Sequence, residues 1–416
     1  MNKKILAIIT VILLGISGVA AVFVLKDSDL PSSFIDYRSN ETVKDFEGRD
    51  VPIPTSLDGG IITVGRGGAP RWLAYFPDEF ESLVMVSDTL NVDSQGSLDY
   101  SYAYGDILTN VKTHSRDNMN DSEKMVMLNP SLILVDDSIY ADNKELCNEI
   151  SAFTPLAVVD GMFYITLNGF WTAEYKVIDG FKNQAHLYGK LLRNEEKADE
   201  IIVNFQDALD DIRSYCTEPS GVSTYVAGPV WSGSNHLTTT FNPYLCLELV
   251  GGTNTLGNRT QNGAQNLDIE EVEMLNFNRM IIEASTVQTA KAGDSEGVLK
   301  IVEKRNNDDD PDNDIEMFIV LPSVSHNLNP LCSLISAYHL ASIEHGTLSV
   351  EDVREKGNDL FVKFYGEDRG AHIMEDLDEY YANIKNGIHE DICTDLFSEV
   401  EVKKLSNGKY IFTKKE

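Results

Sequence analysis

The segment EKMVMLNPSLILV at residues 123–135 has a near copy in EEVEMLNFNRMII at residues 270–282, which lies 147 residues further along the chain. The copies align without a gap, with Met-Leu-Asn at 127–129 over Met-Leu-Asn at 274–276. Each copy begins with an amphipathic turn, passes a polar break and enters a short apolar run, which predicts a helix followed by a buried parallel strand. Helix-to-strand units resemble one another in any α/β protein, so the surroundings of each copy decide whether it marks a repeated lobe.

Both copies follow a strand that runs into a glycine-containing loop. IITVG at residues 61–65 enters RGGAPRWLAYF, and STYVAGPVWSGSNH at residues 223–236 repeats this order before the second copy. Between them, apolar residues at helical spacing predict a helix from about Trp171 to Tyr215, with an internal restart at Asn194. The sequence therefore predicts an α/β fold: two similar α/β lobes joined by a long bridging helix, with a ligand cleft between them.

Further segments fill in the two lobes. Strands are predicted at LVMVSD (83–88), PLAVVD (155–160) and EMFIVLPSV (316–324), and a helix at 329–346. Turns at Gly48 and at Asn407-Gly408 predict one hairpin near each end. The expected organisation is an N-terminal anchor or signal at 1–26, a polar stalk at 27–41, an N-terminal α/β lobe at 42–170, the bridging helix at 171–215, and a C-terminal α/β lobe with the terminal hairpin at 216–416.

Composition and charge exclude several classes of protein. A chain of 416 residues with 42% hydrophobic residues can fill two or three cores. The 34 basic and 66 acidic residues give a net charge of -32, which repels the phosphates of nucleic acids and excludes nucleic-acid binding. The most acidic part, at 306–314, is typical of a solvated loop because it lacks the glycine and distal glutamate of an EF-hand.

The first 26 residues direct the chain to a membrane. Ile5 to Leu25 carry no charge and are long enough to span a bilayer, which favours a retained anchor over a cleaved signal peptide. GVAAV at 18–22 keeps cleavage open as the alternative. Lys3 and Lys4 precede the apolar segment, so the main body is expected at the cell membrane on the extracytoplasmic side.

The chain lacks the motifs of the common catalytic and metal sites. It has no GxSxG elbow and no HExxH pair, and GRGGAPR lacks the Lys-Ser/Thr ending of a phosphate loop. The histidines are scattered, so no catalytic residue, resident metal or cofactor is expected. Five widely spaced cysteines without a CxxC pair leave two alternatives open, one or two disulfides or buried thiols.

The order of these segments resembles that of the helix-bridged (class III) substrate-binding proteins of ABC transporters for iron-siderophores, haem and cobalamin. The resemblance runs from about Thr42 to Gly387 and rests on five phrases taken in order. They are VKDFEGRDVPIP with IITVG after it, EKMVMLNPSLILV, HLYGKLLRNEEKADEIIVNF, LVGGTNTLG, and NPLCSLISAYHLASIEHG with LFVKFYG. Ser131 replaces the family's usual aspartate after the proline, and the bacterial lipoprotein cysteine is absent.

The resemblance implies an extracytoplasmic component of an ABC importer. Such a protein captures a metal chelate, with an iron-siderophore expected first and a corrinoid or haem next, and delivers it to a permease with its ATPase subunits. The alternative on the same architecture is a bare zinc or nickel receptor, or a chelatase-like metal-handling enzyme. A surface adhesion module is disfavoured, because tandem β repeats and Ser/Thr-rich stalks are missing.

The resemblance also implies a docking role for one surface glutamate on each lobe, which meets an arginine of the permease. Glu123 and Glu270 occupy matching positions, and Glu271 is a near rival of Glu270. The alternative role of these side chains is to supply negative charge at a helix N-terminus, which stabilises a helix by about 0.3 to 1 kcal/mol.

Ligand-binding residues are expected where strands hand over to loops, at 66–72 and DYSYAYGD (99–106) in the first lobe and at 231–236 and 323–327 in the second. A chelate offers broad, partly apolar faces and is often anionic, so aromatic rings supply contact area while an arginine or backbone amides supply charge complementarity. Packing within the lobes is the alternative role of the aromatic residues. The candidates are Gly67, Gly68, Arg71, Trp72, Tyr100, Tyr102, Tyr104, Trp231, His236 and His326, with Arg71 and Trp231 preferred.

Overall fold

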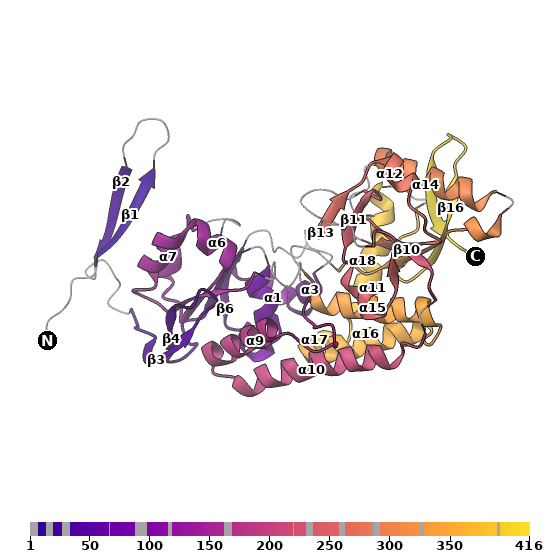
Figure 1. The fold of residues 1–416 in the computed structure, drawn as a ribbon. Helices are drawn as coiled ribbons and strands as arrows, with labels where there is room; N and C mark the ends of the chain where they lie inside the picture. Colours follow the sequence, from indigo (N-terminus) through magenta and orange to yellow (C-terminus); the bar gives the residue numbers. More distant parts are fainter. Residues whose placement is uncertain are drawn as a thin grey trace. The chain divides into compact units, whose positions relative to one another are not determined.

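The computed structural model describes residues 7–13, 20–26, 34–65, 67–87, 98–114, 119–161, 169–218, 220–229, 236–257, 263–284, 286, 292–308, 310–323, 328–388 and 392–416. These residues form two compact units (Figure 1). Unit 1 comprises Met1–Gln95, Tyr104–Met162 and Asp179–Ile202, and unit 2 comprises Gly96–Ala103, Phe163–Ile178 and Val203–Glu416.

Unit 1 is built on a five-stranded parallel sheet of order β7-β6-β5-β8-β9. The central strands β5 (Ile61–Val64) and β8 (Leu132–Asp136) are buried along their whole length, as expected of parallel strands covered on both faces. The other elements of unit 1 are β3 (Arg38–Lys44), β4 (Asp50–Pro54), α1 (Gly68–Ala74), α2 (Pro77–Phe80), β6 (Leu83–Ser87), α4 (Gly105–Leu108), β7 (Lys112–His114), α5 (Ser122–Met127), α6 (Asp137–Asp142), α7 (Lys144–Ile150), β9 (Leu156–Val159) and α9 (Asp179–Leu192).

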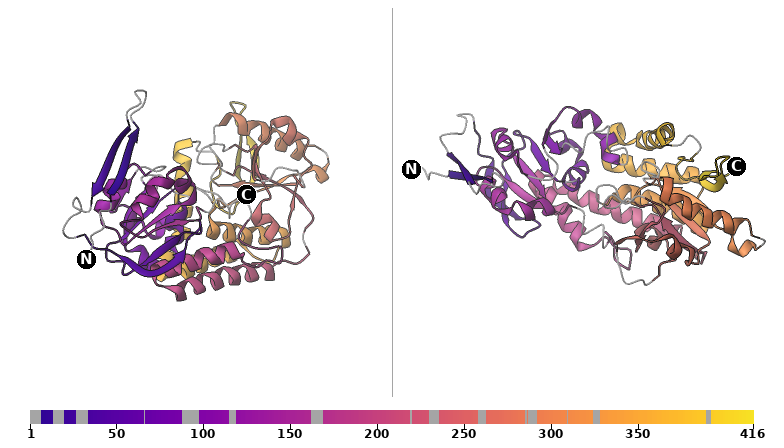
Figure 2. Two further views of the ribbon diagram at one scale, coloured as in Figure 1. Left: turned by 60° about the vertical axis from the view of Figure 1, so that its left-hand side comes forward. Right: turned by 90° about the horizontal axis from the view of Figure 1, so that it is seen from above.

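Unit 2 has a six-stranded sheet of order β12-β10-β14-β15-β16-β17, whose first four strands are parallel and whose last two are antiparallel. Its helices α15 and α16 lie side by side (Figures 1 and 2). The elements are α3 (Asp99–Ala103), β10 (Ser223–Ala227), β11 (Thr239–Asn242), α11 (Leu245–Leu249), β12 (Thr253–Asn254), β13 (Gly263–Asn266), α12 (Ile269–Glu273), β14 (Arg279–Glu283), α14 (Ala292–Asn306), η4 (Pro311–Asn313), β15 (Glu316–Val320), α15 (Pro330–His345), α16 (Val350–Tyr365), α17 (Glu367–Gly370), α18 (Ile373–Ile388), β16 (Glu399–Lys404) and β17 (Tyr410–Lys414).

The repeat seen in the sequence is a repeat of structure. The first copy forms α5 and β8, and the second forms α12 and β14. Leu132 of β8 pairs with Ile61 of β5, and the equivalent Arg279 of β14 pairs with Thr224 of β10. Each copy therefore places its strand beside the first strand of its own parallel sheet, and the prediction of two similar α/β lobes is confirmed.

The predicted helix over 171–215 is two helices that begin later. Trp171 and Val177 form an isolated antiparallel bridge instead of a helical turn, and α9 begins at Asp179. The restart at Asn194 is confirmed, because its side-chain oxygen accepts a hydrogen bond from the Lys197 amide (3.1 Å) ahead of α10 (Glu195–Ser214). The two units divide within α10, between Ile202 and Val203.

The described residues of the apolar N-terminal segment form two strands. Residues Ala7–Leu13 (β1) and Ala20–Lys26 (β2) pair as antiparallel strands. Among the helices of the described ranges, none combines the length and apolar character needed to cross a bilayer.

Unit 2 also includes Asp99–Ala103, which is part of the DYSYAYGD segment predicted to be a loop of the first lobe. DYSYAYGD forms α3 and α4 instead, and the carboxylate of Asp99 in α3 accepts a hydrogen bond from the Tyr365 hydroxyl (2.7 Å). Arg369 donates to the carbonyl of Ala103 (2.9 Å). These contacts bring α3 into unit 2, so the predicted boundaries of the first lobe at 42–170 do not match the compact units.

Both predicted hairpins are present, and of the two alternatives for the cysteines the structure has free thiols. β3 pairs with β4 around Gly48 (φ 76°), and β16 pairs with β17 around Gly408 (φ 85°). All five cysteines lie in the described ranges, and none forms a disulfide.

A buried ion pair fixes β14 to α15. The guanidinium of Arg279 donates to the carboxylate of Glu344 (2.6 Å), whose side chain is 0% exposed, and to that of Glu316 (3.0 Å), which is 52% exposed. Removing one partner of a buried pair leaves an uncompensated buried charge, whereas an exposed pair contributes little.

We therefore expect Glu344→Ala to lower the free energy of unfolding by about 3–5 kcal/mol. The matched substitution Glu316→Ala, which removes the exposed partner of the same arginine, should cost about 1 kcal/mol or less. Urea unfolding followed by circular dichroism measures both. Equal losses in the two variants would contradict this assignment.

Candidate functional site at the strand ends

The strand order reverses once in each parallel sheet. In unit 1 the chain moves from β5 outward to β6 and β7, then returns to add β8 on the other side of β5. In unit 2 it moves from β10 to β12, then returns to add β14 on the other side of β10. The carboxyl ends of the strands at such a reversal are where open α/β sheets bind ligands. Each unit therefore has one candidate position, between β5 and β8 or between β10 and β14.

In unit 1 this position is closed by the carboxylate of Asp136 at the end of β8. Its Oδ1 accepts a hydrogen bond from the amide of Ala69 (2.8 Å) in the first turn of α1. Gly65, at the end of β5, has a φ of 150°, and a Cβ on it would overlap the Asp136 carboxyl group. Only glycine therefore lets β5 end beside this carboxylate.

Unit 2 repeats the arrangement with different residues. Gly228, which comes directly after β10, has a φ of 84°, and a Cβ on it would overlap the side chain of Thr286. At the end of β14, Glu283 is 0% exposed, and its Oε1 accepts hydrogen bonds from the Tyr244 hydroxyl (2.9 Å) and from the Ser323 amide (3.0 Å) and hydroxyl. The carboxylate joins the loops after β11 and β15.

Asp136 and Glu283 are equivalent residues that sequence reasoning missed. Each lies one position beyond the apolar run of its repeat copy, at the same separation of 147 residues. The signal that would have found them was in the alignment itself, because both copies continue with an acidic residue. An acid directly after a buried strand lies at the ligand edge of the sheet.

Burial and the charges of these carboxylates raise the pKa values of neighbouring side chains. Burial, together with the charges of Asp136 and Asp160, raises the pKa of Tyr188 well above its usual value. Tyr188 therefore stays protonated and donates its hydroxyl hydrogen to the Ala69 carbonyl (3.1 Å). In unit 2, burial and then the charge of Glu283 raise the pKa of the Cys246 thiol, which keeps this thiol protonated and unreactive.

The predicted glycine loop begins α1, and one amide of the first turn of α1 is bound within unit 1. Gly67 is the N-cap of α1 in a left-handed conformation (φ 117°), and a Cβ on Gly68 would overlap the backbone of Gly161. Because the amide of Ala69 is already bound to Asp136, the partial positive charge of this turn is neutralised within unit 1.

The predicted residues of α1 and its surroundings are packed inside unit 1. Arg71, Trp72 and Tyr104 are each 0% exposed. The Trp72 ring contacts Phe181 (4.6 Å between centroids), and Tyr104 donates to the carbonyl of Ala74 (2.8 Å). Trp72 of α1 and Tyr104, which contacts α1, therefore both have the surroundings of core residues.

Three other candidates belong to unit 2. Tyr100 is buried, whereas Tyr102 of the same helix α3 and His236, ahead of β11, are only partly buried. Burial, together with the neighbouring Tyr380 and Asp376, raises the pKa of Tyr102 well above its usual value, so its phenol remains a hydrogen-bond donor at neutral pH. The last two candidates, Trp231 and His326, lie outside the described residues.

The two glutamates predicted to dock on a permease are both exposed. Glu123 lies in the first turn of α5 and Glu270 in the first turn of α12. Glu271, the near rival, is used within its own helix. Its carboxylate accepts from the Asp268 amide (3.0 Å), and its amide donates to the Asp268 carboxylate (2.7 Å), which is a reciprocal N-terminal cap.

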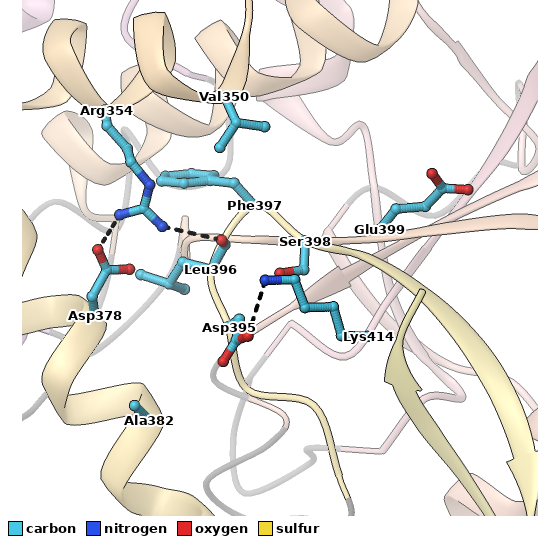
Figure 3. A pocket seen from close by; sticks show the side chains of 10 residues that line it. All are labelled: Val350, Arg354, Asp378, Ala382, Asp395, Leu396, Phe397, Ser398, Glu399 and Lys414. Carbon is cyan, nitrogen blue, oxygen red and sulfur yellow. Dashed lines mark hydrogen bonds and ion pairs between the residues drawn. The ribbon is translucent and has the colours of Figure 1, made fainter. Parts of the chain in front are cut away.

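The described residues contain no group of three or more His, Cys, Asp or Glu side chains that could hold a metal ion. A pocket of about 520 Å3 in unit 2 lies between α16, α18 and the C-terminal hairpin (Figure 3), and none of the predicted ligand-binding residues lines it. Its charged groups satisfy one another, since Arg354 pairs with Asp378 and lies over the Phe397 ring (5.4 Å), while Lys414 pairs with Asp395 (3.4 Å). This pocket is therefore separate from the predicted site.

The strand-end glycine of unit 2 gives a test with an internal control. Gly221 also has a left-handed backbone (φ 71°), but a Cβ there meets only open space. Gly221→Ala should therefore lower the unfolding free energy by about 1–2 kcal/mol from backbone strain alone. Gly228→Ala should cost about 1–3 kcal/mol more, because the new methyl group displaces Thr286. Thermal unfolding of the two variants measures the difference, and equal costs would contradict the close packing at this strand end.

Comparison with known proteins identifies the architecture. No family model matches the chain, and no curated protein matches it. Among solved structures, the molybdate periplasmic binding protein MolA of Haemophilus influenzae, solved with molybdate bound, is 16% identical over 79% of this chain and 98% of its own, with a TM-score of 0.56.

Two further solved structures agree. An ABC transporter solute-binding protein of Sulfurospirillum deleyianum is 15% identical over 79% of this chain and 96% of its own (TM-score 0.54). A periplasmic solute-binding protein of Veillonella parvula is 14% identical over 83% of this chain and 98% of its own (TM-score 0.55). The chain has the two-lobed α/β fold of the solute-binding proteins of ABC transporters.

Proposed function

We propose that this chain is the extracytoplasmic substrate-binding component of an ABC importer, which captures a metal chelate and delivers it to a membrane permease and its ATPase subunits. The observation that carries the proposal is the duplicated parallel sheet, in which each unit has its own strand reversal at the carboxyl edge. The three solved proteins of similar fold described above are all named as binding proteins for solutes.

A chelate is preferred over a simple oxyanion because a helix amide that could bind a small anion at the strand end of unit 1 is already bound. An oxyanion is best held by helix N-terminal amides. In unit 1 the amide of Ala69 is taken by Asp136, and in unit 2 the strand end carries the buried carboxylate of Glu283. An iron-siderophore is the first candidate and a corrinoid or haem the next, since each offers broad ligand faces to aromatic side chains.

Tyr102 and His236 are the best candidates for ligand contact among the described residues, because both are only partly buried. The partly exposed ring of Tyr102 offers an aromatic face to a broad ligand. Arg71, Trp72 and Tyr100, which are fully buried, would reach a ligand only after their surroundings rearrange.

Native mass spectrometry of the full chain in detergent tests the ligand class. The panel consists of a ferric catecholate siderophore, a ferric hydroxamate siderophore, cobalamin, haem, molybdate, zinc and nickel. We expect one-to-one binding of one iron chelate or tetrapyrrole, with a Kd on the order of 1 μM or tighter. Binding of zinc or nickel alone would support the metal-ion receptor instead, and binding of molybdate alone would contradict the preference for a chelate.

For the chelate that binds, Tyr102→Ala and His236→Ala should each raise the Kd by about 5- to 30-fold, which corresponds to about 1–2 kcal/mol. Tyr104→Phe is the matched control, since it removes only the buried hydrogen bond to Ala74 and should leave the Kd within about twofold. Isothermal titration calorimetry measures all three. Unchanged affinity in both alanine variants would remove these residues from the site.

The membrane anchor is a separate part of the proposal. It rests on the uncharged length of Ile5 to Leu25. A retained anchor should keep the mature chain in the membrane fraction after a high-salt wash of fractionated cells. A soluble mature form that begins near Val22 would instead identify a cleaved signal peptide.

A further inference from the structure

Three segments of the chain match Asn-X-Ser/Thr, the acceptor motif for an N-linked glycan, in which X is any residue except proline. They begin at Asn40, Asn120 and Asn258. So short a motif also arises by chance, and its surroundings decide whether a modifying enzyme can use it. Asn258 lies outside the described residues, whereas the first two motifs can be compared.

Asn40 lies in a bulge of the hairpin formed by β3 and β4 (Figure 1). Arg38 pairs with Pro54 and Thr42 with Pro52, so β3 has two more residues than β4 between these pairs. Proline has no amide hydrogen, and neither proline of β4 can donate to β3. The ladder therefore opens around Asn40, which is the place where an extra residue is tolerated.

Ser39 shapes this bulge. Its hydroxyl donates to the carbonyl of Glu41 (3.1 Å) and accepts from the amide of the same residue (3.1 Å). A serine that bonds the backbone two residues further on replaces regular strand pairing by a local turn. Asn40, which lies between the two bonded residues, is therefore presented on a turn.

The two side chains of this motif that an enzyme must contact are accessible. Asn40 and Thr42 are both exposed. Within the described part of the chain, neither side chain takes part in a hydrogen bond. The carboxamide nitrogen of Asn40 and the hydroxyl of Thr42 can therefore be bound without breaking a contact of the folded chain.

The motif at Asn120 differs in this respect. Asn120 is exposed, but Ser122, which supplies the hydroxyl, is only 6% exposed and begins helix α5. The Ser122 amide donates to the carbonyl of Met119 (2.9 Å), so the backbone of this motif already forms the first turn of the helix. An enzyme that contacts the hydroxyl two residues after the asparagine can reach it at Thr42 but not at Ser122.

We propose that Asn40 carries an N-linked glycan and that Asn120 does not. This inference rests on the proposed function for the extracytoplasmic location of the main body. The sugar donor is a glycan linked to a polyprenyl phosphate or diphosphate, and the Nδ2 atom of Asn40 attacks its anomeric carbon. A C–N bond forms as the C–O bond to phosphate breaks, the lipid-linked phosphate leaves with the electron pair, and Nδ2 loses one proton to the transferase.

Mass spectrometry of the full chain isolated from its own cells tests the proposal. An endoproteinase that cleaves after lysine releases residues 27–44 and 113–124, each of which contains one of the two motifs. We expect at least about half of the peptide 27–44 to carry sugar on Asn40, located by fragmentation, and less than about one twentieth of the peptide 113–124 to be glycosylated.

Two substitutions of Thr42 separate recognition of the motif from any other modification of Asn40. Thr42→Ala removes the hydroxyl and should lower the glycosylated fraction at least about tenfold, whereas Thr42→Ser keeps it and should leave the fraction within about threefold. Circular dichroism checks that both variants fold, as expected at an exposed position. An unmodified peptide 27–44 in the parent chain, sugar that persists in Thr42→Ala, or equal glycosylation of Asn120 would each overturn the proposal.

Ligand binding separates this inference from the proposed function. Asn40→Gln should lose the sugar and keep the Kd of the purified chain for its chelate within about twofold, because Asn40 is not one of the proposed ligand contacts. If the parent chain binds a chelate but its peptide 27–44 is unmodified, only the glycan inference fails. If the peptide is glycosylated but no chelate binds, only the proposed ligand class fails.

Discussion

Two neighbouring parallel strands can end side by side only if their last side chains do not collide, and this constraint governs both units. In unit 1 the solution is Gly65 against Asp136, and in unit 2 it is Gly228 against Thr286. Once the strand ends are close, the acid at the end of the second strand can bind the helix or loop next to it. The carboxylate of Asp136 thereby holds the first turn of α1, and Tyr188 of α9 fixes the same turn through its carbonyl.

This arrangement ties the strand ends of unit 1 to the helix that follows them. Glu283 plays the same part in unit 2, where it joins Tyr244 to Ser323. The hydrogen bonds to Oε1 of Glu283 therefore connect loops of unit 2 to the end of β14. Both units therefore use the same device at their strand ends, and we propose that solute contact falls to partly buried groups such as Tyr102 and His236.

Much of the fold was predictable from sequence, because apolar periodicity is a local signal. The ungapped repeat predicted the helix and the buried strand of each copy, and the glycine after IITV marked the right strand end. The helices of DYSYAYGD were missed because its tyrosines and glycine favour a loop locally. Their helical form depends on distant partners, notably the hydrogen bond from Tyr365 to Asp99.

The site was less predictable, for a physical reason. A sequence does not distinguish an aromatic residue that lines a cleft from one that fills a core, and Trp72 and Tyr104 proved to be core residues. Asp136 and Glu283 were not predicted as site residues because the apolar pattern ends one residue before each of them.

The C-terminal hairpin has a consequence for solubility. A sheet that ends in an open strand invites other chains to add to it, and natural proteins prevent this with lysines on the edge or with a covering segment. β17 is the last strand of the unit 2 sheet, and the exposed lysines of its hairpin are Lys403, Lys404, Lys409, Lys414 and Lys415. In unit 1 the edge strand β9 is covered instead, since the Val158 amide donates to Asp45 (3.0 Å) and its carbonyl accepts from the Phe46 amide (3.0 Å). The edge at β17 is thus protected against strand addition by charge, and the edge at β9 by a covering segment. Both protections reduce aggregation of the folded chain.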